Sequence, residues 1–170
     1  MTDNDNDPVP VTLPEGRFEG RVAFQQLVRD ALACAAQEGW NEIILSDASF
    51  EDWPLGERAV VESLNAWSAR GRRMTLLARR YDAVQRLHAR FVNWRGTWGH
   101  LIECHGCPVA DPLELPSAIW SPGWVMQRLD PVRSTGHAGR EPARRLALRE
   151  SLLEWIGKSS PAFPASTLGL

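Results

Sequence analysis

The sequence is poor in lysine, cysteine and long apolar runs, and each shortage argues against a class of protein. No uninterrupted apolar stretch reaches the roughly 18 residues of a membrane-spanning helix, so no membrane association is expected. Three cysteines in 170 residues are an odd and sparse set for a secreted disulfide scaffold. The acidic, polar start, Met-Thr-Asp-Asn-Asp, resembles neither a signal nor a transit peptide. We therefore expect a cytoplasmic protein with reduced thiols.

The composition supports one globular domain with less ordered ends. Hydrophobic residues make up 44% of the chain, enough for a real core. We predict a flexible leader over residues 1–16, one domain over 17–157 and an extended tail over 158–170. The apolar tail residues Phe163, Leu168 and Leu170 pack back on the domain in the favoured interpretation. In the alternative they dock into a neighbouring chain, which would make a homodimer.

Charge is distributed unevenly along the chain. Residues 1–69 carry 13 acidic residues and four arginines, a net charge of −9, whereas residues 70–95 carry a net charge of +7. The basic stretch contains Arg70, Arg72, Arg73, Arg79, Arg80, Arg86, Arg90 and Arg95. We favour mutual neutralisation within the fold, because the sequence pI is 6.1 and nucleic-acid binders are usually more basic. Binding of nucleic acid through arginine and aromatic side chains is the alternative.

Hydrophobic periodicity predicts helices alternating with strands. Helices are predicted near residues 22–38, 58–70, 82–94 and 142–156, and strands at 43–45, 74–78, 100–104, 117–120 and 124–130. Strands that alternate with helices favour parallel pairing. The expected fold is a three-layer α/β domain with a mostly parallel sheet, helices on both faces and an antiparallel hairpin near residues 117–130.

A candidate ligand site follows from this arrangement without any motif, because ligands of open α/β sheets gather at the carboxyl ends of the strands. Ser46 and Asp47 end the first strand, Arg79, Arg80 and Tyr81 follow the second, and His105 ends the third. If these strands are parallel neighbours, the six residues form one rim that would bind phosphate or carboxylate through arginine. The alternative is that Asp47 caps a turn and the arginines are simply solvated.

The segment Cys104-His-Gly-Cys107 has a spacing typical of metal and redox sites. A structural zinc needs four ligands, and no second pair of cysteines is present. Alternation along the strand places His100 and Cys104 on the same face, so these two residues with Cys107 are the candidate ligands. We favour cysteines without a metal or redox role, because Pro108 and Pro112 follow where a redox motif has a helix.

The order of elements around "IILSD", "SARGRRMTLLA" and "SAIWSPGWVMQRLD" resembles one half of a phospholipase D-like fold, over residues 20–130. The superfamily carries a His-x-Lys-x-x-x-x-Asp motif on a hairpin, and "SAIWSPGW" stands at that place without a histidine. The resemblance therefore implies a degenerate, non-catalytic relative, similar to bacterial domains of that type, with a phosphate-binding rim.

The expected function is a non-catalytic binding or regulatory module without a cofactor. Its partner would be a phosphate-bearing ligand, a nucleic acid or a protein. The alternative is a metal- or thiol-dependent protein that uses Cys104 and Cys107.

Overall fold

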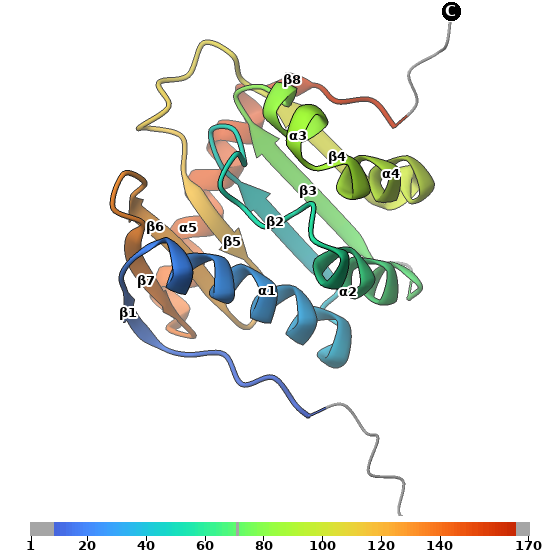
Figure 1. Cartoon of the computed structure of the whole chain (residues 1–170). Coiled ribbons are helices and arrows are strands. Elements are labelled where there is room, and N and C mark those ends of the chain that lie inside the picture. The colour runs from blue at the N-terminus through green and yellow to red at the C-terminus, as the bar shows by residue number, and fades with distance from the viewer. Residues whose placement is uncertain (1–8, 71, 166–170) are drawn as a thin grey trace, which may run out of the picture.

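A computed structural model describes residues 9–70 and 72–165 of the chain. They form three layers, with one eight-stranded sheet between four helices on one face and a single helix on the other (Figure 1). The helices are α1 (Arg21–Glu38), α2 (Arg58–Ser68), α3 (Asp82–Leu87), α4 (Ala89–Thr97) and α5 (Pro142–Gly157), and a short 3₁₀ turn spans Gly99–Leu101. The strands are β1 (Gly16–Phe18), β2 (Glu42–Ser46), β3 (Arg73–Ala78), β4 (Ile102–Gly106), β5 (Ser117–Trp120), β6 (Val125–Asp130), β7 (Thr135–Gly139) and β8 (Ser160–Pro161).

The sheet has two halves of different type. Its strand order is β1-β7-β6-β5-β2-β3-β4-β8, and β2, β3 and β4 are parallel neighbours. Every other pair is antiparallel, including the predicted hairpin of β5 and β6. The α/β class, the layers and the hairpin are confirmed, whereas a mostly parallel sheet is wrong. The parallel part ends at β2, because its other neighbour, β5, is antiparallel to it and follows β4 in the chain without an intervening helix.

Alternation along the strands divides the interior into two cores. Ile43 and Leu45 of β2 face the larger core beneath α1 to α4, while Ile44 faces the smaller core beneath α5. Strands covered on both faces read as continuous apolar runs, which is why β2 and β3 are visible in the sequence. α1 ends at Gly39, whose φ of 68° and N–H bond to the Ala35 carbonyl make a left-handed cap.

The segment predicted as one helix over residues 82–94 forms two helices, so the prediction of a continuous helix is wrong. α3 ends and α4 begins at His88, whose backbone leaves the helical region with φ −123° and ψ 57°. The buried His88 ring lies with Nε2 2.8 Å from the Phe50 carbonyl oxygen. Leu87, the last residue before the break, lies at the surface with 48% exposure.

Both chain ends pack against the domain where they are described. Leu13 is buried in the larger core, and the Trp124 indole donates to the Pro14 carbonyl at 3.1 Å. The described part of the predicted leader thus contacts the domain, while residues 1–8 lie outside the described residues. Phe163 of the predicted tail is buried against Tyr81, with ring centroids 5.1 Å apart. Leu168 and Leu170 lie outside the described residues.

β7 is a strand that sequence periodicity does not predict. Its sequence, Thr-Gly-His-Ala-Gly, has little β-propensity. Gly136 is needed there, because a Cβ at this position would lie 2.0 Å from the Gln127 carbonyl oxygen of β6. Within the described residues, no helix combines the length and apolarity needed to cross a bilayer.

Candidate functional site

A hollow of about 620 Å³ opens where β2 ends and β5 begins. Its polar lining includes two arginines and three acids, Arg21, Arg128, Asp47, Glu51 and Asp52. Its apolar wall includes Leu87, Pro112, Leu113, Leu115 and Pro131. The hollow therefore has a polar, slightly acidic floor and an apolar rim.

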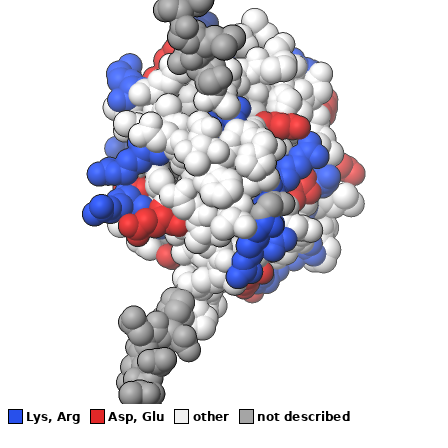
Figure 2. All heavy atoms as spheres, turned by 90° about the vertical axis from the view of Figure 1, so that its right-hand side faces the viewer, with Lys and Arg blue, Asp and Glu red and all other residues white. Residues whose placement is uncertain are grey.

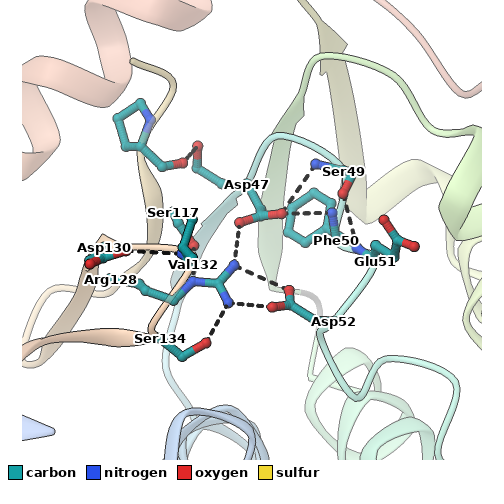
Figure 3. A network of polar contacts seen from close by, with 12 residues as sticks. Asp47, Ser49, Phe50, Glu51, Asp52, Ser117, Arg128, Asp130, Val132 and Ser134 are labelled. Atoms are coloured by element: carbon teal, nitrogen blue, oxygen red, sulfur yellow. Dashed lines mark hydrogen bonds and ion pairs between the residues drawn. The ribbon is translucent and has the colours of Figure 1, made fainter. Parts of the chain in front are cut away.

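Arg128 of β6 forms the floor of this hollow (Figure 3). Its side chain is almost fully buried, and its guanidinium lies 4.0 Å from the centre of the Phe24 ring. The Nη atoms donate to Asp47 at 3.0 Å and to Asp52 at 2.6 Å. Nε donates to Ser117 at 3.1 Å. A further bond to Ser134 and a second bond to Asp52 bring the total to five.

These five contacts decide what Arg128 is able to do. A guanidinium has five N–H donors, and here each of them has an acceptor inside the protein. A phosphate would have to displace a buried carboxylate in order to reach this side chain. Arg128 therefore ties β6 to the loop after β2 and is a poor anion-binding residue.

Asp47 shapes that loop. Its carboxylate accepts the backbone N–H of Ser49 at 3.1 Å and that of Phe50 at 2.8 Å. These bonds hold Phe50 in the left-handed region, with φ of 58°. Phe50 then packs edge-on against Trp53, with ring centroids 4.9 Å apart. Asp47 thus has the turn-capping role of the alternative interpretation and also faces the hollow.

The six predicted site residues lie at one edge of the sheet but face different spaces. Ser46 is fully buried and donates to the Pro116 carbonyl at 2.6 Å. Asp47 lines the 620 Å³ hollow, whereas Arg79, Arg80 and Tyr81 line another hollow of about 470 Å³. The structure therefore does not bring the predicted acid and the predicted arginines into one cavity.

The second hollow lies between the end of β3 and residues 160–164. Among the described residues, no carboxylate lies within ion-pair distance of Arg79 or Arg80. One Nη atom of Arg79 donates to the Pro108 carbonyl at 3.3 Å, while its buried Nε has no partner in the part of the chain that the structure describes. Asp82 also lines the hollow, which leaves it with a net positive charge.

Tyr81 and His105 meet through the backbone. The buried Tyr81 hydroxyl donates to the His105 carbonyl at 2.8 Å. Burial, more than any other cause, raises the pKa of Tyr81, so its hydroxyl stays neutral. The His105 ring points to the other side of the tail segment, with Nε2 3.6 Å from a Glu103 oxygen.

The cysteine hypothesis does not fit the structure. Cys104 belongs to the larger core and Cys107 to the smaller core, so their thiols lie on opposite faces of the sheet. Both are buried and free, as is Cys34. Across residues 9–70 and 72–165, no three His, Cys, Asp or Glu side chains cluster as metal ligands would. Cys104 and Cys107 therefore cannot bind one metal together, with or without His100.

Among the described residues, the basic stretch forms no ion pair with the acidic N-terminal third, contrary to the favoured interpretation. Of its arginines, Arg73 forms the one ion pair found among the described residues, and its partner is Glu103 at 3.2 Å. Arg95 is buried, with 6% exposure. The face of the molecule shown in Figure 2 carries blue and red groups dispersed around an uncharged centre. The blue groups gather at the left edge and at the lower right of this view, each with red groups beside them.

Sequence reasoning missed Arg128, Asp52, Ser117 and Ser134. A signal was present for Arg128, because strand alternation puts it on the same face as the buried Met126. A charged side chain on a core face needs a partner. The identity of that partner, 76 and 81 residues distant along the chain, is not encoded locally.

Neither a protein-family model nor a curated protein sequence matches this chain. Solved structures do match its fold. One is TrmBL2, an archaeal chromatin protein whose structure shows a novel mode of DNA binding. The match has a TM-score of 0.65 and 17% identity, and covers 93% of this chain and 57% of that chain.

A second similar structure is Nuc from Salmonella typhimurium, a phospholipase D family member. It matches with a TM-score of 0.52 and 12% identity, over 79% of this chain and 90% of that chain. At these identities the likeness concerns the fold alone. The chain thus has an α/β fold similar to that of a phospholipase D family member.

Proposed function

We propose that this chain is a non-catalytic binding module that recognises a phosphate-bearing ligand at the end of β3. The observation that carries the proposal is the pair of adjacent arginines, Arg79 and Arg80, in one hollow of about 470 Å³ without an ion-paired carboxylate in the described structure. The buried Nε of Arg79, which no described residue accepts from, adds a further donor. Guanidinium groups bind phosphate oxygens in a bidentate way, so such a hollow suits a phosphate group.

The non-catalytic part of the proposal is supported by the resembled superfamily. Its reaction needs the His-x-Lys motif on the hairpin of β5 and β6, and the sequence has Ser117-Ala-Ile119 at the start of that hairpin. Ser117 accepts a hydrogen bond from the Arg128 Nε. A serine engaged with a guanidinium lacks the adjacent base that activates a nucleophile.

Calorimetric titration with inorganic phosphate and with a nucleoside triphosphate tests the proposal. We expect binding by the unaltered chain and a loss of roughly 10- to 100-fold in affinity for the double variant Arg79→Ala/Arg80→Ala, since charge-assisted hydrogen bonds are lost. Arg133→Ala, an exposed arginine on the turn between β6 and β7, is the matched control. Equal affinity of the double variant and the control would refute the Arg79–Arg80 site.

Nucleic acid is the second candidate, because one observation favours it. Arg80, Arg86 and Arg90 are exposed within eleven residues, and no ion pair is formed by them within the described structure. TrmBL2, whose fold is similar, binds DNA. Fluorescence anisotropy with a labelled duplex should then show affinity that falls steeply with salt, by a log–log slope of about −0.9 for each phosphate contacted. Absence of binding at low salt would exclude this candidate.

A further inference from the structure

A second cavity lies beside the proposed phosphate site, along the segment that follows α5, and the two cavities share Pro161, Ala162 and Pro164 in their lining. We define residues 159–165 as the C-terminal strap. It pairs with β4 through β8 and through the Ala162 N–H bond to the Cys104 carbonyl at 2.9 Å, and Figure 1 shows it along the β4 edge of the sheet. The cavity between the strap and β4 measures about 610 Å³.

Arg95, from the last turn of α4, is a buried charged residue in the lining of this cavity. Its side chain lines the cavity, and the residue is 94% buried. Within residues 9–70 and 72–165, the buried Nε has no hydrogen-bond partner. One Nη atom makes a long bond of 3.4 Å to the Gly99 carbonyl, and the Phe163 ring centre lies 5.9 Å from the guanidinium carbon. No described carboxylate pairs with it.

The neighbours of Arg95 do not neutralise its charge. Glu103 lines the same cavity, but its carboxylate is engaged by Arg73 at 3.2 Å and lies 3.6 Å from the His105 Nε2. Burial raises the pKa of Cys104 to about 11, although nearby Arg95 acts in the lowering direction, so the thiol is neutral at neutral pH. An uncompensated buried cation is costly, and an anionic ligand would remove that cost.

The other walls of the cavity determine what kind of anion fits. Ile102 and Cys104 form the sheet side, and Pro161, Ala162 and Pro164 form the strap side. These surfaces are apolar, whereas inorganic phosphate is hydrated on all sides. A ligand with one carboxylate and an apolar body fills such a cavity better, because pockets combine apolar walls with few placed polar groups.

We propose that the cavity between β4 and the C-terminal strap binds a small organic acid, whose carboxylate pairs with the guanidinium of Arg95 while its apolar body packs against Ile102 and the strap prolines. The bound acid contacts both the sheet and the strap. Binding therefore fixes the strap against β4, next to the hollow that Arg79 and Arg80 line.

Calorimetric titration with benzoate, benzamide and inorganic phosphate tests this site. The titration uses the full chain with Arg79→Ala/Arg80→Ala, so that phosphate has no access to the proposed phosphate site. Benzoate should bind, while benzamide, of the same shape without the charge, and phosphate, with the charge but no apolar body, should bind at least about tenfold more weakly, a difference of 1.4 kcal/mol. Binding of benzamide equal to that of benzoate would overturn the role of Arg95. Binding of phosphate as tight as benzoate would overturn the choice of an organic acid.

Variants separate this site from the proposed phosphate site. Arg95→Met should lose benzoate binding by roughly 10- to 100-fold, whereas the exposed control Arg80→Met should keep it. Equal loss in both variants would overturn the proposal. The unaltered protein gives a second measurement, the ¹⁵N–¹H signal of the Arg95 Nε. We expect benzoate to shift this signal and benzamide to leave it in place, and an unmoved signal at saturating benzoate also counts against the site.

Discussion

The molecule contains two deeply buried arginines with opposite surroundings, Arg128 on β6 and Arg95 on α4. Both side chains lie against an aromatic ring, Phe24 for Arg128 and Phe163 for Arg95. Among the described residues, Arg128 contacts two carboxylates and makes five hydrogen bonds, whereas Arg95 makes one long bond to a carbonyl and its Nε has no partner. A buried guanidinium thus stabilises the fold where its N–H donors are bonded to the protein. It is a candidate ligand-binding group where they are not.

The largest expected effect on stability follows from replacing Arg128. Arg128→Met leaves Asp47 and Asp52 without their cation, and the free energy of unfolding should fall by about 3–5 kcal/mol, because a buried charge loses its partner. Urea denaturation followed by tryptophan fluorescence measures the change, with Arg133→Met as the exposed control. A loss below 1 kcal/mol, roughly that of a surface substitution, would contradict the structural role.

The two carboxylates of the Arg128 cluster should differ from each other. Asp47→Asn should lower the free energy of unfolding by about 1.5–3 kcal/mol, since this buried carboxylate also holds two backbone N–H groups. Asp52→Asn should cost at most about 1 kcal/mol, because the Asp52 side chain is 22% exposed and water replaces part of the interaction. The same urea titration compares them. A larger cost at Asp52 would reverse the assigned order.

Removing the other arginine should cost much less. In Arg95→Met the apolar chain stays and an uncompensated charge disappears, so we expect the free energy of unfolding to remain within about 1 kcal/mol of the unaltered protein. Thermal and urea unfolding without added acid measure this change. If Arg95→Met destabilises the protein as strongly as Arg128→Met, Arg95 is a structural tie as well and the comparison fails.

The smallest effect concerns the thiol beside Arg95. The pKa of Cys104 in the folded state is about 11, above its ordinary value of 9.0. Between pH 9 and about 11 the folded thiol therefore keeps its proton, while the thiol of the unfolded chain loses it. The contribution of Cys104 to stability therefore falls as pH rises from 9 to about 11, because the unfolded state then binds fewer protons. Titration of a ¹³C-labelled Cys104 Cβ reports the pKa directly. In Arg95→Met the pKa should rise further, and a lower pKa would contradict the contact between the two groups.

The parallel half of the sheet could be predicted from the sequence, and the antiparallel half only in part. β2 and β3 are continuous apolar runs between amphipathic helices, a local pattern. β7 has two glycines in five residues, and its place in the sheet depends on the close approach of Gly136 to β6. That requirement is a tertiary contact, which single-sequence periodicity does not contain.

The sequence could predict individual residues of the candidate sites but not how they come together. Arg95 comes four residues after the buried Phe91 on one helix face, so its burial could have been suspected. The surroundings of Arg95 depend on where the strap pairs with β4, which is a contact distant in sequence. The helix break at His88 could not be predicted from the sequence either. Parallel pairing of β2 and β3 did place Asp47 and Arg79 at one edge, as predicted. Their separation into two hollows is decided by side-chain packing.

The order of the strands has a consequence for synthesis of the chain on the ribosome. The outermost strands are β1, which pairs with β7, and β8, which pairs with β4. Strand β1 emerges early, and its neighbour in the sheet, residues 135–139, emerges much later. One edge of β4 stays unpaired until residues 160–161 emerge. A nascent chain halted before β7 thus exposes open strands to chaperones and to other nascent chains.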